Sequence, residues 1–281
     1  MEIIYGLLGT EVNNGMFNAD FTNSCRKDSE GNFIHSDVSL KYCFRNSWAT
    51  RYGLDSVLAY TKYDENLNPM TLEKNFESKF KIGKTKKDIE EQLLQYKDIK
   101  NFGIAFAIIG KNLSLTGPVQ IGWGKNISPE ASEKMVQIGS PFASPSKAKE
   151  GEDKKDKGQT TLGSQYLLEN ALFVAPVVVT LGENYTKEDL KEFIETSKTA
   201  VTTTQSRSMM GCNSAFSLFV KLENSVIATD LLSQRVTLLG DKLIFDFKGL
   251  NLKEVQLYVN TFKYEVEIIN NSMEISVENI F

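Results

Sequence analysis

The stretch from residue 98 to residue 125 constrains the fold of this chain more than any other part of the sequence. Residues 102–109 form an apolar, aromatic-rich run with the length of a buried strand, and residues 110–112 have the composition of a turn. Residues 119–123 alternate their side chains as a second strand does. Three glycines nearby permit close approach of backbones: Gly117, Gly122 and Gly124. The stretch therefore predicts a glycine-rich element of a β-sheet.

The rest of the chain contains further strand and helix patterns. Strand patterns cover residues 2–8, 166–180, 215–222 and 242–247, and one or two more strands are expected within residues 255–277. Helix patterns begin after Ser36, at Lys87 and at Thr186. The core therefore reads strand, helix, strand, strand, helix, strand, which is the order of a split β-α-β or ferredoxin-like domain. We predict an α+β fold, and 281 residues are enough for one domain with a sizeable core.

Two polar blocks interrupt this order and are interpreted as insertions. Residues 64–87 are polar and end in a cluster of lysines. Residues 128–163 form the second block, and residues 144–161 within it are rich in charged residues, Gly and Ser and contain no aromatic residue. Such a composition cannot bury a core, so we expect residues 144–161 to be mobile.

Neither the first residues of the chain nor its apolar runs indicate a membrane or a secreted protein. The first four residues include Glu2 and lack a basic leader, so a secretory signal is not expected. The longest apolar runs, residues 102–109 and 171–181, are too short to cross a bilayer. We expect a soluble, cytoplasmic protein without membrane contact.

Residues suited to metal binding or nucleophilic catalysis are few. The three cysteines, Cys25, Cys43 and Cys212, are far apart, and His35 is the only histidine. This spacing argues against a zinc site or a disulfide framework. A Ser-His-Asp or Cys-His arrangement would need His35, and no Walker loop occurs. We therefore expect no catalytic residue, no metal and no cofactor.

The distribution of charge bears on nucleic-acid binding. The formal net charge of −4 argues against a free-standing nucleic-acid binder, which is usually basic. Local charge matters more, because charges farther than about 10 Å from a phosphate are screened at moderate salt. Residues 196–222 contain no acidic residue, and residues 38–52 carry only basic charges. These two segments are candidates for phosphate binding.

The helix that begins after Ser36 carries two basic residues one turn apart. Ser36 is a good N-cap, and Asp37 lies near the positive end of the helix dipole. The four-residue spacing predicts that Asp37, Lys41 and Arg45 share one exposed face, where Lys41 and Arg45 would bind neighbouring phosphates. The alternative is a solvated face with an Asp37–Lys41 ion pair, worth only a few tenths of a kcal/mol.

A polar segment at residues 202–211 is a further candidate. It contains Gln205, Ser206, Arg207 and Ser208. Hydroxyl groups and backbone amides of this kind bind phosphate or ribose oxygens without reading the base sequence. The alternative is an ordinary Ser/Thr connector before the strand at residue 215.

The tryptophan of the glycine-rich stretch admits two interpretations. As a stacking platform it would contact nucleic acid together with Gln120 and Lys125. A core position is the expected one for Trp123, because single tryptophans are usually buried.

Several short motifs of this sequence occur in an order that is typical of one family. Residues 98–103 read Asp-Ile-Lys-Asn-Phe-Gly, and residues 116–124 read Thr-Gly-Pro-Val-Gln-Ile-Gly-Trp-Gly. An Asn-Asn-Gly loop at residues 13–15, a basic residue at position 26 and the Ser-Asp-Val start of a helix at residue 36 precede them. Together they resemble the backbone subunit of type I CRISPR effector complexes, in the repeat-associated mysterious protein superfamily, and the subtype that the resemblance predicts is I-B. Lys100 stands where that family usually has arginine.

The resemblance implies a fold and a set of partners. It implies a palm like an RNA-recognition motif that spans residues 1–281, a helical finger insertion at 53–97 and a β-hairpin thumb at 126–165. The family's subunit coats the guide RNA without catalysis and polymerises along it. The implied partners are therefore the guide RNA (crRNA), target DNA through the guide, further copies of the chain and other subunits of the complex.

The resemblance also implies site residues. Patterns and resemblance together predict these RNA-binding residues: Asn14, Arg26, Lys41, Arg45, Gln120, Trp123, Lys125, Gln205, Ser206, Arg207 and Ser208. Four apolar residues at the head of the thumb are predicted to wedge between bases, as apolar side chains separate DNA base steps: Met135, Val136, Ile138 and Phe142.

Two alternatives stay open at this point. Relatives in type III complexes use a loop aspartate for metal-dependent RNA cleavage, and Asp20 or Asp28 would take that role in an endoribonuclease. The other alternative is a purely structural protein that assembles mostly through contacts with its own copies. Metal-dependent cleavage that is lost on changing Asp20 or Asp28 would select the first, and polymerisation without RNA would select the second.

Overall fold

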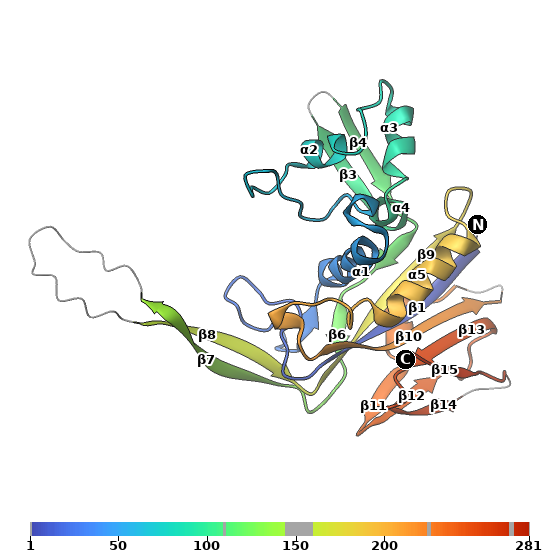
Figure 1. Ribbon diagram of the computed structural model, residues 1–281. Coiled ribbons are helices and arrows are strands. Elements are labelled where there is room, and N and C mark those ends of the chain that lie inside the picture. The colour runs from blue at the N-terminus through green and yellow to red at the C-terminus, as the bar shows by residue number, and fades with distance from the viewer. Residues whose placement is uncertain (1, 109–110, 144–159, 224–225, 270–272, 281) are drawn as a thin grey trace, which may run out of the picture.

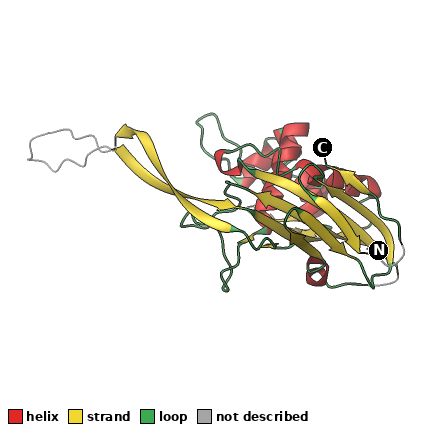
Figure 2. Cartoon of the chain, turned by 90° about the horizontal axis from the view of Figure 1, so that it is seen from below, coloured by secondary structure: helices red, strands yellow, loops and turns green. Residues whose placement is uncertain are grey.

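The fold combines one large sheet with helices and three smaller sheets (Figure 1). The structure is a computed structural model that describes residues 2–108, 111–143, 160–223, 226–269 and 273–280. Helices and strands alternate irregularly along the chain, so the predicted α+β class is confirmed (Figure 2). Within the described ranges no helix is both long and apolar enough to cross a membrane.

The main sheet is built around β1 (Glu2–Val12), which pairs antiparallel with β9 (Ala171–Leu181) on one side and with β10 (Cys212–Leu222) on the other. Two short strands, β5 (Val119–Ile121) and β6 (Gly124–Asn126), pair antiparallel with β9. The remaining strands of the sheet lie at its edges: β2 (Ile34–His35), β13 (Leu252–Val259) and β15 (Val277–Asn279). The order of the central strands is therefore β10, β1, β9 and then β5 and β6.

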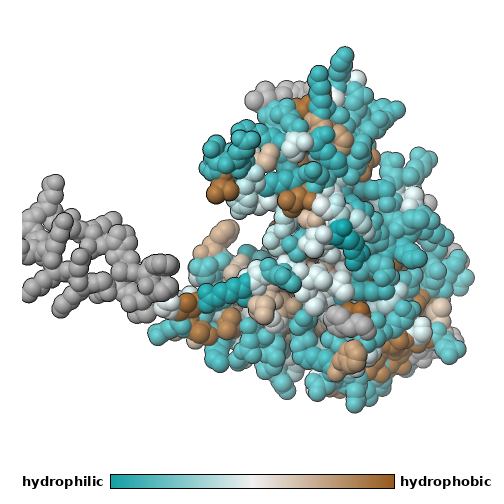
Figure 3. Space-filling model, in the orientation of Figure 1, coloured by the Kyte–Doolittle hydropathy of each residue, from teal (hydrophilic) through white to brown (hydrophobic). Residues whose placement is uncertain are grey.

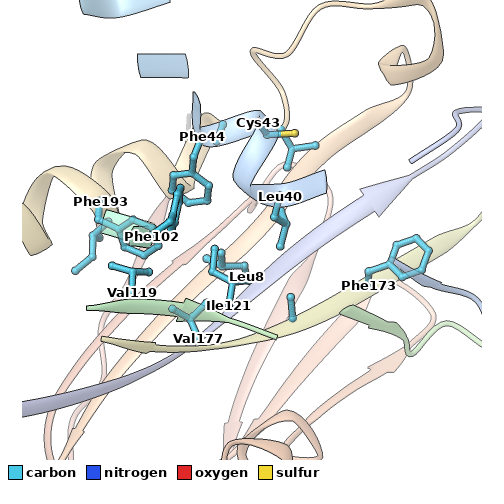
Figure 4. Close-up of a cluster of buried hydrophobic side chains, with 14 of the residues drawn as sticks. Leu8, Leu40, Cys43, Phe44, Phe102, Val119, Ile121, Phe173, Val177 and Phe193 are labelled. Carbon is cyan, nitrogen blue, oxygen red and sulfur yellow. The ribbon is translucent and has the colours of Figure 1, made fainter. Parts of the chain in front are cut away.

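Two helices cover one face of the main sheet. They are α1 (Asp37–Tyr52), between β1 and the β5 region, and α5 (Lys187–Thr199), between β9 and β10. Thr186 and Asp189 form a capping box at the start of α5, where the sequence pattern predicts a helix. Phe44 of α1 stacks on Phe193 of α5 with a centroid distance of 4.7 Å. Leu8, Val119, Ile121 and Val177 of the sheet belong to the same buried cluster (Figure 4).

The opposite face of the main sheet is covered by C-terminal elements. A three-stranded sheet formed by β11 (Val236–Leu239), β12 (Lys242–Asp246) and β14 (Glu265–Ile269) packs on it, together with α6 (Thr229–Ser233). Phe216 of the main sheet and Phe245 of β12 meet edge to face with a centroid distance of 5.2 Å. Apolar residues on both faces of β1 and β9 thus explain why these strands read as nearly continuous apolar runs.

A small lobe, residues 54–116, stands apart from the sheet (Figure 1). It contains 3₁₀ helix η1 (Leu54–Ser56), α2 (Leu72–Glu77), α3 (Lys86–Leu93), α4 (Lys97–Phe102), β3 (Gly103–Ile108) and β4 (Lys111–Thr116). Its own apolar cluster includes Phe76, Leu93 and Phe106. The strand predicted at residues 102–109 therefore forms, but it pairs with β4 in this lobe, whereas β5 pairs with β9 of the main sheet.

The neck between the small lobe and the main sheet depends on two glycines of the glycine-rich stretch. Gly103 has φ +72°, and a Cβ added to it would lie 2.1 Å from the Leu115 carbonyl oxygen. A Cβ on Gly117 would lie 2.2 Å from the carbonyl carbon of Phe102. Only glycine allows the two chain segments of the neck to pass this closely.

A long antiparallel hairpin, β7 (Ser132–Ala143) and β8 (Thr160–Glu169), projects from the body (Figures 1 and 2). It occupies the position of the predicted second insertion. The segment predicted to be mobile, residues 144–161, lies outside the described residues except for Thr160 and Thr161, which are part of β8. The strand predicted at residues 166–180 is two strands, because Asn170 adopts φ +53° and separates β8 from β9.

Candidate nucleic-acid interface

A groove opens where four segments that are distant in sequence meet. They are the Asn-rich loop after β1, the first turns of α1, strand β8 and the segment around η2 (Arg207–Met209). The groove has a volume of about 650 Å³. Its lining residues are Met16, Phe17, Asn18, Ala19, Asn23, Val38, Ser39, Tyr42, Cys43, Ser164, Gln165, Ser206, Ser208 and Met209. We call this surface the polar groove.

The polar groove is lined by uncharged side chains. Hydroxyl and amide groups supply its hydrogen-bonding atoms, apolar side chains such as those of Met16, Val38 and Met209 supply the rest of the lining, and none of its lining residues is acidic or basic. The molecular surface is hollowed between the small lobe and the hairpin (Figure 3), and the groove's lining includes residues of α1 and of β8 in the hairpin. Groups of this kind hydrogen-bond ribose and phosphate oxygens without the repulsion that a carboxylate would add.

Backbone contacts bring the predicted loop residues together. The amide of Asn13 donates to the Gly211 carbonyl oxygen at 2.8 Å, and the amide of Met16 donates to the Ser208 carbonyl oxygen at 2.7 Å. Asn14 adopts φ +57° and is exposed beside this junction. The predicted residues of the later segment lie here too, with exposed or partly exposed side chains: Gln205, Ser206, Arg207 and Ser208.

Lys41 and Arg45 do not form the exposed face that the helix pattern predicts. Their side chains are only 17% and 15% exposed. Lys41 pairs with Asp37 at 2.7 Å, which is the alternative that the sequence offered. The Arg45 guanidinium donates to Asp98 at 3.2 Å, and both cations lie 5.6 Å from the centroid of the Phe102 ring. The expectation of an exposed face was wrong because α4 packs against α1 at this point.

Asp98 anchors the joint between the small lobe and the body. Its carboxylate is fully buried and accepts hydrogen bonds from the backbone amides of Leu58 at 2.9 Å and Ala59 at 2.8 Å. Arg45 is the third donor to this carboxylate. A buried carboxylate is tolerated when donors surround it in this way.

Three further contacts attach α4 to the second half of the body. Lys97 pairs with Glu192 at 2.7 Å, and Lys100 pairs with Asp189 at 2.6 Å. The Tyr185 hydroxyl donates to the Asn101 side chain at 2.6 Å. Residues 98–103, which carry much of the family resemblance, therefore hold the joint and the neck of the small lobe.

Trp123 is not a core residue, and this expectation was wrong. Its side chain is 49% exposed, and the Arg26 guanidinium lies 5.9 Å from its ring centroid. Gly122 and Gly124 explain the displacement, because each is pressed against a neighbour: Pro176 and the His35 ring. The backbone here is fixed by these contacts, and the indole remains at the surface.

The predicted RNA-binding residues lie on both faces of the main sheet. Gln120 and Lys125 pair with Val178 and Val174, whose side chains point away from α1 toward the C-terminal face. Trp123 lines a pocket with Val174 on that face. The sheet therefore separates Gln120, Trp123 and Lys125 from the polar groove, which the sequence could not show.

The hairpin presents the predicted wedge residues on two faces. Val136 and Ile138 alternate with Met135, so they point to the opposite face of the ribbon. Met135 is exposed, and the other two are partly exposed. The Phe142 side chain lies outside the described part of the structure. At the base of the hairpin Glu133 accepts a hydrogen bond from the Cys25 amide at 2.7 Å, which joins the hairpin to the Asn-rich loop.

The candidate catalytic aspartates, Asp20 and Asp28, each close a tight loop. Asp20 Oδ1 accepts from the amides of Thr22 and Ser24, and Asp28 Oδ1 accepts from those of Glu30 and Asn32. A hydrogen bond from the Thr22 hydroxyl lowers the pKa of Asp20, and one from the Asn32 side chain lowers the pKa of Asp28. Asp64 makes the same contacts with residues 66 and 68 in the small lobe. The repeated geometry identifies a loop-forming role for all three.

His35 and the cysteines are structural in this arrangement. The His35 ring is buried between Phe17 and Phe173, with centroid distances of 4.9 and 5.2 Å, and burial lowers its pKa to about 4. All three cysteines are buried and free, and burial raises the pKa of Cys43 to about 12. No group of three or more His, Cys, Asp or Glu side chains in the described ranges is placed to hold a metal ion.

Sequence reasoning missed several residues of the polar groove: Asn18, Asn23, Ser39, Tyr42, Ser164 and Gln165. No spacing rule connects them, because they come from a loop, a helix and a hairpin. The abundance of Asn in residues 13–32 is the one signal that pointed to this region.

Comparisons with known proteins relate this fold to one family. The family model described as CRISPR-associated protein Cas7 matches residues 3–247. No curated protein sequence matches the chain. A solved chain from "CRISPR RNA-guided surveillance complex, pre-nicking" is similar in fold, with a TM-score of 0.50 and 12% identity over 85% of this chain and 81% of that chain.

Two further solved chains are more distant. One is from "Cryo-EM structure of the Type III-B Cmr-beta bound to cognate target RNA", with a TM-score of 0.45 and 8% identity over 78% of this chain and 61% of that one. Another, from "CRISPR RNA-guided surveillance complex", has a TM-score of 0.42 and 13% identity over 85% of this chain and 76% of that chain. Because the family model spans most of its length, this chain belongs to the CRISPR-associated protein Cas7 family.

Proposed function

We propose that this protein is a non-catalytic, guide-RNA-binding backbone subunit that polymerises along the guide in a DNA-targeting surveillance complex of type I. Membership of the Cas7 family supports a backbone role. The surveillance complex that contains the similar solved chain is guided by CRISPR RNA. The observation that carries the proposal is the polar groove, because it gathers hydrogen-bonding groups from four segments into one surface without an acidic residue.

The groove fits a strand that is held by its backbone. Side-chain hydroxyls and amides bind ribose and phosphate oxygens of any base sequence, so successive copies can occupy one guide. In RNA-guided recognition the protein reads the shape of the nucleic acid and base pairing reads its sequence. An uncharged groove also accounts for an RNA-binding role in a chain with a net charge of −4.

The order of the central strands supports a ferredoxin-like palm. Strands β10, β1, β9 and β5 lie side by side, and α1 and α5 follow β1 and β9 in the chain. This is the arrangement of two interleaved β-α-β units. We assign the small lobe as the finger and the β7–β8 hairpin as the thumb, with Val136 and Ile138 on the face that would separate bases.

The non-catalytic assignment rests on the state of the candidate aspartates. Asp20 and Asp28 use carboxylate oxygens to close their own loops, as Asp64 does in the small lobe. A catalytic aspartate needs its carboxylate oriented toward a metal and the substrate. Cleavage of bound RNA with Mg²⁺ that is lost in Asp20→Ala or Asp28→Ala, and retained in Asp64→Ala, would overturn this assignment.

The assembly test uses light scattering of the full chain with guide-length RNA. The protein alone is expected to be small, because net negative copies repel, and RNA is expected to produce particles whose mass rises with RNA length. A mass that is unchanged by RNA would contradict the proposal. A large particle without RNA would favour the purely structural alternative.

A further inference from the structure

A second recessed surface lies on the face of the main sheet opposite the polar groove. Its wall is the half-exposed indole of Trp123, and its floor is formed by Val174, Pro176 and Val236. Gln234, which follows α6, lies at the rim with Lys125 of β6. The pocket has a volume of about 290 Å³. We call it the indole pocket.

The charges around the indole pocket are positive. Lys125 is the one charged residue in its lining, and its side chain is exposed. The Arg26 guanidinium stacks on Trp123 at 5.9 Å and adds a second cation. Among the ion pairs that the described residues form, none includes Lys125 or Arg26. The nearest carboxylates are those of Asp28, which interacts with the charge of Lys125, and Asp20, which interacts with that of Arg26, but neither forms a direct ion pair. An anion at this rim would therefore meet two cations whose charges no direct ion pair neutralises.

This combination of groups selects a flat, apolar ligand that carries a negative charge. An indole face and a proline ring favour an aromatic ring, and the Gln234 amide can hydrogen-bond the polar edge of that ring. Lysine and arginine beside the opening favour phosphate. A volume near 300 Å³ is at the lower end of the range for small-ligand pockets, which suits a single nucleotide.

We infer that the indole pocket binds an unpaired nucleobase of single-stranded nucleic acid, with the adjoining phosphate at Lys125 and Arg26. This inference rests on the proposed function only in taking nucleic acid as the partner, since the sheet places the pocket apart from the polar groove. A strand at this pocket is thus a second strand, or a part of the guide that has left the groove. Base stacking on an aromatic ring tolerates any base.

Intrinsic fluorescence provides a direct test, because the chain has two tryptophans. Trp48 is 1% exposed and its indole N–H donates to the Thr196 hydroxyl at 3.1 Å, whereas Trp123 is half exposed. Titration of the full chain with single-stranded oligomers of about six nucleotides is expected to quench the emission of Trp123. The quench should disappear in Trp123→Phe and remain in Trp48→Phe. Ribo- and deoxyribo-oligomers are run separately, and the tighter one identifies the kind of strand.

Affinity measured by anisotropy of a labelled oligomer gives the size of the effect. Trp123→Ala is expected to weaken binding by about 5- to 150-fold, the range for losing one stacked base. Lys125→Ala should weaken binding and make the slope of log K against log salt shallower by about 0.7. Phe262→Ala, which removes an exposed aromatic ring elsewhere, serves as the control and should leave the affinity unchanged.

Two results would overturn the inference. One is emission that stays unquenched by either oligomer while guide-length RNA still drives assembly, which leaves the proposed function standing. The other is Trp123 emission that changes with protein concentration alone, which would mark the pocket as a contact between copies. Failure of assembly with guide-length RNA, with quenching intact, would instead count against the proposed function.

Discussion

The joint at α4 and the polar groove differ in the residues that form them: the joint contains buried and paired charged groups, and the groove contains uncharged groups. At the joint, a fully buried carboxylate, two ion pairs and two glycines at van der Waals distance fix the small lobe on the body. In the groove, uncharged hydroxyls and amides come from a loop, from α1, from β8 and from the segment around η2. One of the segments that give the chain its family resemblance, residues 98–103, lies at the joint, so this part of what looks like a functional motif maintains the fold.

This contrast predicts different consequences of substitution in the two regions. Changes at the joint should remove stability, because each buried group there depends on its partners. Changes to the exposed Ser206 and the partly exposed Ser208 of the groove should weaken RNA binding while stability stays nearly constant, because these side chains have few partners in the free protein.

Asp98→Ala should have the largest effect. Removal of this carboxylate leaves the Arg45 guanidinium and the amides of Leu58 and Ala59 without their acceptor. Breaking a buried ion pair on one side typically costs about 3–5 kcal/mol. Urea unfolding measures the loss, and Asp64→Ala, at an exposed loop, is the control. A cost no larger than that of the control would contradict the anchoring role of Asp98.

His35, buried between Phe17 and Phe173, should make stability depend on pH. Burial holds its pKa near 4, below the ordinary value of 6.5, so the unfolded chain binds the proton more tightly. Stability is therefore complete above about pH 6.5 and is lost as pH falls toward 4, by about 3 kcal/mol in total at about 1.4 kcal/mol per unit. The single imidazole resonance reports the pKa directly by NMR. Titration near pH 6.5 would show that the ring is not buried.

The combined change Ser206→Ala and Ser208→Ala tests the groove. Two lost hydrogen bonds of about 0.5–1.5 kcal/mol each should weaken RNA binding by roughly 5- to 150-fold. The slope of log K against log salt should stay the same, because no charge is removed. Stability should fall by about 1 kcal/mol or less, since Ser206 caps only the amide of Met209. Ser29→Ala, on an exposed loop, is the matched control; equal binding in both variants would remove the groove from the RNA path.

Lys41→Ala should have the smallest effect. The Lys41 side chain lies between the joint and the polar groove. Its ion pair with Asp37 is partly exposed and is worth about 0–1 kcal/mol. If Lys41 leaves Asp37 to bind a phosphate, the salt slope becomes shallower by about 0.7 in this variant. An unchanged slope would assign Lys41 to the joint, where it already lies beside Phe102.

The sequence alone determined the class of fold and most of its elements. Periodicity identified α1 and α5, and apolar runs identified β1, β9 and β10, because these signals depend on neighbours within a few residues. Ser36 marks the start of α1 as predicted, but its side chain makes no capping hydrogen bond. The short sequence motifs of the glycine-rich stretch, residues 98–103 and 116–124, identified the family. Glycines such as Gly103 and Gly117 are part of these motifs because no other residue fits where two backbones touch.

Only the tertiary structure decided which side chains face the ligand. Lys41 and Arg45 read as a basic stripe, but α4, which follows fifty residues later in the chain, covers them and supplies Asp98. Trp123 read as core, but its neighbours Gly122 and Gly124 fix the backbone against Pro176 and His35 and leave the indole outside. The exposure of a side chain depends on what packs against it from distant segments, and local sequence patterns carry no record of those partners.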